Sequence, residues 1–209
     1  MVVSFLRVFF ARDVVACDVH ACVAARPRLP RVLGVVHNAL LALYSACVAV
    51  GVGAHWIATA RGPSVCGATT PLPAWILTTW YVSKMWEWGD TALLVSRGRR
   101  LERLHLVHHA STASLVALQT WDRASQTPLY EVGAFLNALV HTAMYAYFAR
   151  PHSHLRRWVT RVQVAQHAVM CACLVRSVAT TLPCERDASH NLIPLVLYAF
   201  FFAEFASLH

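Results

Sequence analysis

The sequence predicts an all-α membrane protein, a polytopic bundle of six clear helical spans with a partial or missing first helix. Hydrophobic residues make up 57% of the 209 residues, and charged residues only 13%. A soluble domain carries about 25% charged residues, and the mean hydropathy here is +0.48. Six spans of roughly 20 apolar residues each account for nearly all of the hydrophobic content. The composition argues against a soluble enzyme, a disordered chain and a disulfide-rich secreted module.

The six spans are apolar runs bounded by Pro, Gly or charged residues, which is typical of helix ends. Along the chain they occupy 32–58, 72–96, 104–120, 131–149, 159–181 and 191–208. The third run is the shortest and carries three His, so hydropathy supports it less than the others. We expect one domain over 1–209, with a motif-bearing core in 72–182.

The N-terminal residues 1–25 are not expected to form a complete membrane span. The apolar run Met1–Phe10 is interrupted by Arg7, is too short to cross a bilayer, and has no cleavage site suited to a signal peptide. We expect this segment to be an interfacial or incomplete helix.

Arginine placement predicts the orientation in the membrane. The formal net charge is +8, with 17 Arg and one Lys. Ten of these Arg lie in connections on one side of the predicted bundle: Arg26, Arg28, Arg31, Arg97, Arg99, Arg100, Arg103, Arg150, Arg156 and Arg157. The connections on the other side hold only Arg61, Arg123 and Arg186. Cytoplasmic loops carry the excess of Lys and Arg, so the first set and the C-terminus are expected in the cytosol. This bias accounts for the charge without a nucleic-acid partner.

Two cysteines, Cys66 and Cys184, fall in connections assigned to the opposite, lumenal side. Disulfides persist in such oxidising compartments, so we expect a bridge between them; two unpaired thiols are the alternative. The other five cysteines are interpreted as small apolar packing residues.

Polar residues recur at helical spacing in four of the predicted spans. Charged groups inside a span are costly and normally face the interior of a bundle, whereas a lone His or Gln is usually a helix–helix contact. The four sets are Lys84, Glu87, Asp90 and Thr91; His105, His108 and His109; Asn137, His141, Met144 and Tyr145, with Tyr147 close by; and Thr160, Gln163 and Gln166, with His167. At 1.5 Å per residue, all four lie within roughly 20 Å of the cytosolic end of their spans. They are therefore expected to share one chamber that opens to the cytosol.

In this order the four sets resemble the motifs of the ELO-type very-long-chain fatty-acid elongases, the membrane 3-oxoacyl-CoA synthases. Those motifs read K-x-x-E-x-x-D-T, H-x-x-H-H, N-x-x-x-H-x-x-M-Y and T-x-x-Q-x-x-Q, and the resemblance covers about 32–208. The pair of lumenal cysteines also resembles one in the family. The chain departs from the family in three respects. The family has seven spans, and the first is reduced or missing here. No basic retrieval tail follows Leu208-His209, and Phe148 stands at the end of the third motif where the family usually has Tyr.

The resemblance implies a reaction, its substrates and a location. A long-chain acyl-CoA would condense with malonyl-CoA to give a 3-oxoacyl-CoA two carbons longer, with release of CO2 and CoA. No cofactor and no metal are implied. The implied setting is the lipid of the endoplasmic reticulum membrane, beside the reductases and dehydratase of the elongation cycle, with a homodimer as a candidate assembly.

The residues themselves make a covalent acyl transfer plausible. Such a transfer needs a nucleophile, and no Cys or Ser–His–Asp set lies near the cytosolic chamber. We predict that His108 attacks the thioester to form an acyl-imidazole, that His105 and His109 orient it, and that His141 polarises the thioester or assists the malonyl step. The Lys84, Glu87 and Asp90 series would fix the chamber.

Two other classes of protein remain open from the sequence. A membrane di-iron desaturase or hydroxylase also uses H-x-x-H-H but needs several such boxes, and three His at this spacing could hold one metal. A transporter would carry polar residues through the full depth of the membrane, whereas the lumenal halves of these spans are nearly all apolar.

Overall fold

The computed structural model describes residues 30–60, 71–121, 128–179 and 191–207, and these residues form an all-helical structure without strands. The helices are α3 (Arg31–Ala58), α4 (Ala74–Trp86), α5 (Trp88–Ser96), α6 (Arg103–Trp121), α7 (Pro128–Ala149), α8 (Ser153–Ala179) and α9 (Leu192–Ala206). Each of the six predicted runs is helical over most of the part that the structure describes, so the all-α prediction is confirmed.

Proline and glycine set several of the helix ends. Pro30 and Pro73 directly precede α3 and α4, and Pro128 is the first residue of α7; a fixed φ and a missing N–H suit these positions. After α5 the chain turns at Gly98, with φ of 65°. The Gly98 and Arg99 amides donate to the carbonyls of Val95 and Leu94, the bonding pattern of a Schellman C-cap.

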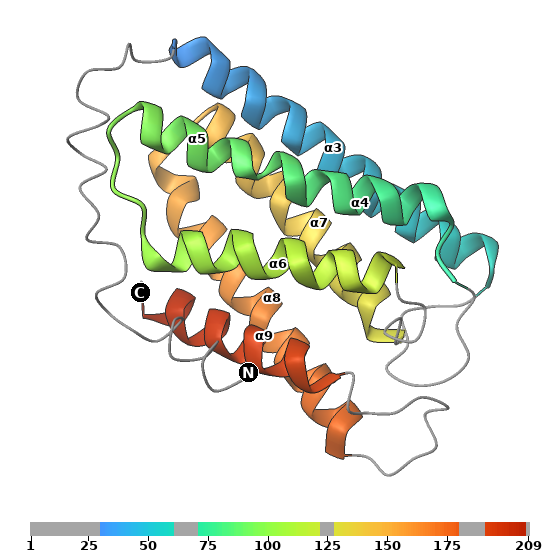
Figure 1. The fold of residues 1–209 in the computed structure, drawn as a ribbon. Coiled ribbons are helices and arrows are strands. Elements are labelled where there is room, and N and C mark those ends of the chain that lie inside the picture. The colour runs from blue at the N-terminus through green and yellow to red at the C-terminus, as the bar shows by residue number, and fades with distance from the viewer. Residues whose placement is uncertain (1–29, 61–70, 122–127, 180–190, 208–209) are drawn as a thin grey trace.

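The helices pack in a closed ring. α3 contacts α7, α7 contacts α8, α8 contacts α9, α9 contacts α6, α6 contacts α4, and α4 contacts α3. α5 continues the direction of α4 (Figure 1). This order brings the four motif-bearing segments around one interior.

The second predicted run, 72–96, is one span in the sequence but two helices in the structure. α4 ends at Trp86 and α5 begins at Trp88, with Glu87 between them. The Asp90 amide donates to the Glu87 carbonyl at 3.0 Å, a tighter i→i+3 bond that often marks a functional position within a helix. Sequence periodicity alone does not reveal this break.

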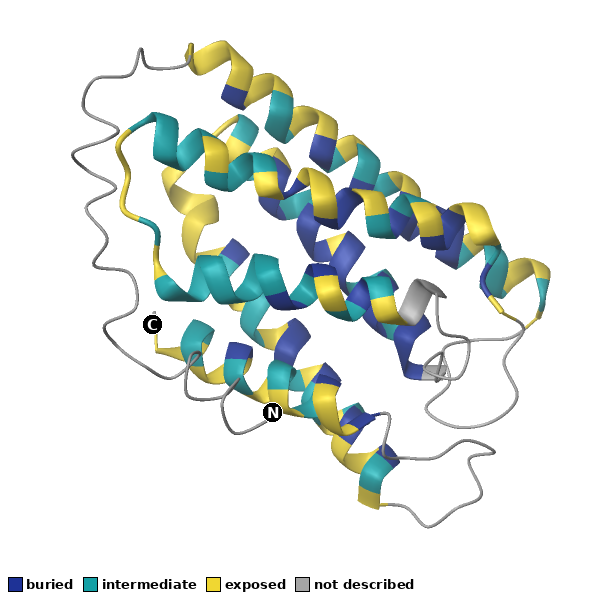
Figure 2. Ribbon diagram, in the orientation of Figure 1, coloured by how far each residue is buried: buried dark blue, intermediate teal, exposed yellow. Residues whose placement is uncertain are grey.

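Apolar side chains cover the outside of the ring. Large hydrophobic residues are exposed along α3 and α9, including Val50, Ile57, Ile193 and Val196, and Figure 2 shows exposed residues on the outer face of α3. By length and composition, three of the described helices could cross a bilayer: α3, Leu129–Ala149 of α7, and α8. The helix α9 is apolar but shorter. The protein is thus a membrane protein, and the count of six spans stays a prediction for the remaining segments.

Two sequence predictions concern residues outside the described ranges. The partial N-terminal segment 1–25 is one, and the bridge between Cys66 and Cys184 is the other. Of the cysteines in the described ranges, Cys47, Cys171 and Cys173 are free thiols. Cys171 and Cys173 are half-buried, whereas Cys47 is exposed and does not fit the interpretation as a packing residue.

Candidate functional site

The centre of the site is a closed ring of four polar side chains from α4, α7 and the break after α4. Lys84 Nζ donates to Glu87 Oε1 at 2.5 Å and to Asn137 Oδ1 at 2.7 Å. The Asn137 amide donates to His141 Nε2 at 3.0 Å. His141 Nδ1 lies 3.1 Å from Glu87 Oε1, near enough for charge attraction but outside hydrogen-bond geometry.

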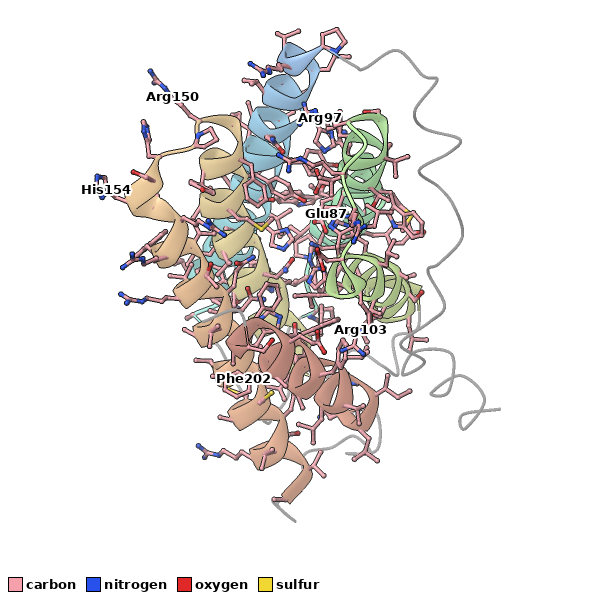
Figure 3. The ribbon with its side chains drawn as sticks, turned by 90° about the vertical axis from the view of Figure 1, so that its left-hand side faces the viewer. Glu87, Arg97, Arg103, Arg150, His154 and Phe202 are labelled. Carbon is pink, nitrogen blue, oxygen red and sulfur yellow. The ribbon has the colours of Figure 1, made fainter. Side chains whose placement is uncertain are left out.

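This ring of four side chains is almost entirely buried. Lys84 is 3% exposed and Glu87 is 1% exposed, and Figure 3 shows Glu87 in the interior while Arg150 and His154 extend outward. A buried charge is tolerated only when it is paired and hydrogen-bonded, and here Lys84 and Glu87 pair with each other. The ring holds His141 in one orientation, since both of its nitrogens face ring members.

A second network meets at Asp90. The Tyr145 hydroxyl donates to Asp90 Oδ2 at 2.6 Å, and His37 Nε2 lies 2.7 Å from Asp90 Oδ1. Because a carboxylate only accepts, His37 donates this bond. Gly89 permits it, since a Cβ there would lie 2.5 Å from His37 Cε1.

Sequence reasoning missed His37. It is one of two His on the first long apolar run, with no motif of His or charged residues at helical spacing to mark it. Its partner, Asp90, lies on α5, far away in the sequence. Neither the neighbouring Asn38 nor the nearby start of the helix marks His37 as a site residue.

The three His of the H-x-x-H-H motif have different surroundings. His105 Nε2 lies 2.8 Å from the Thr91 hydroxyl, and its ring lies 4.3 Å from that of His109, between centroids. His109 Nδ1 is buried without a hydrogen-bond partner among the described residues. The ring of His108 lies 5.6 Å from that of His109 and 6.4 Å from that of His141.

His108 is the member of that motif that lines a pocket within the helical ring. The pocket has a small internal volume of about 40 Å³, is partly open, and is lined mainly by residues of α4, α6, α7, α8 and α9. The backbone carbonyl of His108 accepts hydrogen bonds from the hydroxyls of Ser111 and Thr112. Its ring nitrogens bond to none of the residues that the structure describes.

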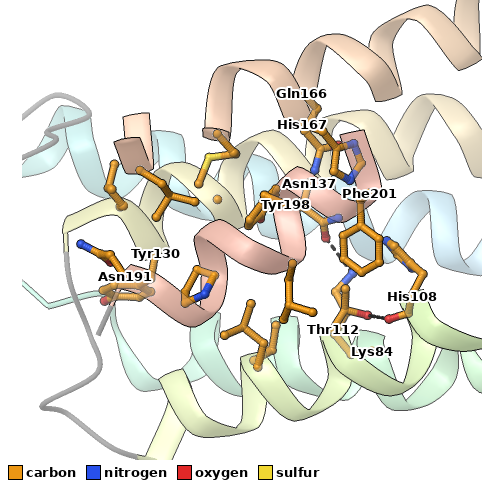
Figure 4. Close-up of a pocket in the computed structure, with 18 of the residues that line it drawn as sticks. Lys84, His108, Thr112, Tyr130, Asn137, Gln166, His167, Asn191, Tyr198 and Phe201 are labelled. Carbon is orange, nitrogen blue, oxygen red and sulfur yellow. Dashed lines mark hydrogen bonds between the residues drawn. The ribbon is translucent and has the colours of Figure 1, made fainter. Parts of the chain in front are cut away.

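The pocket has a polar end and a longer apolar part. His108, Lys84 and Asn137 gather at one end with residues of α8, whereas Tyr130 and Asn191 lie at the other (Figure 4). Most of the remaining lining is aliphatic or aromatic. Such a mostly apolar lining with few placed polar groups is typical of a site that binds a small molecule.

The fourth motif is divided between the site and its surroundings. Gln166 lines the pocket, and Gln163 Nε2 lies 3.2 Å from Met144 Sδ, so that it links α8 to α7. The Thr160 hydroxyl donates to the Arg156 carbonyl of its own helix and does not reach the site.

Tyr147 also lies away from the pocket. It packs against the cluster around Leu41, and its ring is 5.6 Å from that of Phe148. The structure therefore brings together most of the predicted site residues but separates Thr160 and Tyr147 from the rest. Within the described ranges, no three His, Cys, Asp or Glu side chains are arranged to hold a metal ion.

Comparison with known proteins agrees with the resemblance to fatty-acid elongases. The profile of the ELO: GNS1/SUR4 family matches residues 3–209. A fatty acid elongase by name from Schizosaccharomyces pombe is 40% identical over 90 residues, 41% of this chain and 24% of the relative. Long chain fatty acid elongase 1 of Caenorhabditis elegans is 33% identical over 99 residues, 44% of this chain and 33% of the relative. Very long chain fatty acid elongase 6 of Drosophila melanogaster is 27% identical over 154 residues, 68% of this chain and 45% of the relative.

These alignments span between about a quarter and about half of the length of the named relatives. The family match, by contrast, includes all four motifs and every described helix. The chain belongs to the ELO: GNS1/SUR4 family.

Proposed function

We propose that the protein is a fatty-acid elongase, a membrane 3-oxoacyl-CoA synthase that condenses a long-chain acyl-CoA with malonyl-CoA. The observation that carries this proposal is the position of His108. It lines the pocket at its polar end, and its ring nitrogens are not engaged by any described residue. Beyond it the lining of the same pocket is mostly apolar, as the environment of an acyl chain would be.

In the first half-reaction His108 acts as the nucleophile. A ring nitrogen attacks the thioester carbonyl, the C–S bond breaks with its electron pair going to sulfur, and the acyl group remains on the imidazole. One proton passes from the imidazole to the CoA sulfur, so this step needs no proton from solution. His105 and His109 pack beside His108 and fix its ring.

In the second half-reaction malonyl-CoA loses CO2, and the electron pair of the broken C–C bond attacks the acyl carbon. The C–N bond to His108 then breaks, and the imidazole takes up one proton. His141, whose ring lies 6.4 Å from that of His108, assists this malonyl step or polarises the thioester. In the free protein its Nε2 accepts from Asn137 and its Nδ1 faces Glu87, so polarising a thioester would require it to leave one of these partners.

The orientation follows the arginine-rich connections. We infer that Arg97, Arg103 and Arg150 lie on the cytosolic face of the endoplasmic reticulum membrane. This face also holds the polar end of the pocket, because His108 is five residues from the start of α6 at Arg103. CoA would stay outside with its phosphates near these cations, while the acyl chain enters. The product would pass to the reductases and dehydratase of the elongation cycle, and no metal or cofactor takes part.

Product analysis tests the proposed function. Microsomes containing the protein, sealed with the cytosolic face outward, receive labelled malonyl-CoA and a panel of acyl-CoAs of different length and saturation. We expect labelled 3-oxoacyl-CoA two carbons longer than the added chain, without permeabilisation. No labelled product from any acyl-CoA would contradict the activity, and a strict need for detergent would contradict the orientation. Iron content correlated with desaturated or hydroxylated lipid would instead support the di-iron alternative.

A further inference from the structure

His167, on α8, is a buried imidazole that the mechanism above leaves unused. It is 3% exposed and lines the pocket. Its Nδ1 lies 2.6 Å from the carbonyl oxygen of Gln163, one turn earlier on α8. A carbonyl only accepts, so Nδ1 carries the hydrogen, and in the neutral ring Nε2 carries the lone pair.

That lone pair has no donor among the residues that the structure describes. The ring is surrounded by aromatic side chains of α9, at centroid distances of 5.7 Å from Tyr198, 5.7 Å from Phe201 and 5.0 Å from Phe205. Because His167 lines the pocket, its Nε2 can accept a hydrogen bond or a proton from a group that enters with the occupant of the pocket.

The position of His167 relates it to the proposed nucleophile. The rings of His108 and His167 both contact Phe201, at 4.9 Å and 5.7 Å between centroids. Both also contact Phe205, and both line the polar end of the pocket in Figure 4. An imidazole held by a backbone carbonyl, with its other nitrogen free, is the usual arrangement of a catalytic base.

We propose that His167 is a second catalytic residue, the base and acid of the acylation half-reaction; this role rests on the proposed function. As His108 attacks, His167 Nε2 takes the proton that the imidazole of His108 loses, relayed through water in the pocket that both rings line. The protonated His167 then gives this proton to the CoA sulfur as the C–S bond breaks. The proton starts on His108 and ends on sulfur, and His167 returns to its neutral form with Nδ1 still donating to Gln163.

The test is a rapid-quench measurement on the full-length protein in detergent, mixed with acyl-CoA alone. CoA release and acyl-protein formation are followed for the wild type, His167→Phe and His167→Gln, with acyl-CoA binding measured separately. Phe keeps the aromatic packing and removes both nitrogens, while Gln keeps an acceptor that cannot carry the proton. His154→Phe, the same change at an exposed position on α8, is the matched control.

We expect both His167 variants to release CoA at least about 100-fold more slowly, the lower end of the usual contribution of a general base. Acyl-CoA binding should change less than about threefold, and His154→Phe should match the wild type. A release rate within about threefold of wild type in a folded His167 variant overturns the role; if His167→Phe does not fold, His167→Gln decides. Normal wild-type product with normal variant rates overturns only this inference, whereas a wild type that makes no 3-oxoacyl-CoA overturns the proposed function together with it.

Discussion

The Tyr145 hydroxyl donates a 2.6 Å hydrogen bond to Asp90 across 55 residues of sequence and thereby joins α7 to α5. The other oxygen of Asp90 accepts from His37 of α3. One carboxylate thus connects three helices beside the ring formed by Lys84, Glu87, Asn137 and His141. We regard Asp90 as the residue that sets the position of α5, and with it Thr91 and His105, relative to the pocket.

Removing the Tyr145 hydroxyl tests this connection. A hydrogen bond to a charged group contributes about 1.5–3 kcal/mol, so Tyr145→Phe should lower the free energy of unfolding by that amount, measured by denaturation in detergent. Tyr147→Phe is the control, because the Tyr147 hydroxyl bonds to none of the residues that the structure describes. Equal effects of the two variants would show that the bond to Asp90 carries no stability.

The ion pair between Lys84 and Glu87 should behave as a buried pair. Lys84→Met leaves the Glu87 carboxylate, at 1% exposure, without its cation, and breaking such a pair costs about 3–5 kcal/mol. Lys84→Met with Glu87→Leu removes both charges and should recover part of that loss in thermal denaturation. A double variant less stable than Lys84→Met alone would contradict this explanation.

Gly89 should not tolerate a side chain. The Cβ of Gly89→Ala would lie 2.5 Å from His37 Cε1, so His37 must move away from Asp90, and overpacking of this kind costs about 1–3 kcal/mol. Gly53→Ala is the matched control, because its nearest neighbour is Phe135 at 3.9 Å. We expect a lower melting temperature for Gly89→Ala and an unchanged or slightly raised one for Gly53→Ala; the reverse order would refute the close approach of α3 and α5.

The bridge between Cys66 and Cys184 stays a prediction from orientation. If both connections are lumenal, unreduced peptides should contain these two cysteines joined, and mass spectrometry after alkylation without reductant detects the pair. Both thiols alkylated in protein from the native membrane would contradict the bridge.

Much of the fold could be predicted because apolar content and length determine which segments form helices in a membrane protein. The outer ends of helices were less predictable. α8 begins at Ser153 rather than at 159, because its first turns are polar and exposed, and hydropathy does not register them. The break at Glu87 was missed for a related reason: Lys84, Glu87 and Asp90 keep a helical spacing through it.

Motif spacing identified most of the site residues but did not predict which of them line the pocket. His105, His108 and His109 share one helical face, yet of these three His108 alone lines the pocket. Spacing also placed Thr160 with Gln163 and Gln166, although its hydroxyl bonds within its own helix. His37 was missed because its partner, Asp90, lies on another helix, and periodicity within one helix does not report such a contact. Spacing did place His167 with the fourth set, but not its packing against the aromatic side chains of α9.

The most direct test of the account is the chemical state of His108 after exposure to acyl-CoA without malonyl-CoA. The protein should release CoA, and mass spectrometry of its peptides should locate the acyl group on His108. Malonyl-CoA should then discharge it as the 3-oxo product, and His108→Ala should abolish both steps while the protein stays folded. His141→Ala should slow turnover and still allow acylation. An unmodified His108 in protein that is actively forming 3-oxoacyl-CoA would contradict the covalent mechanism.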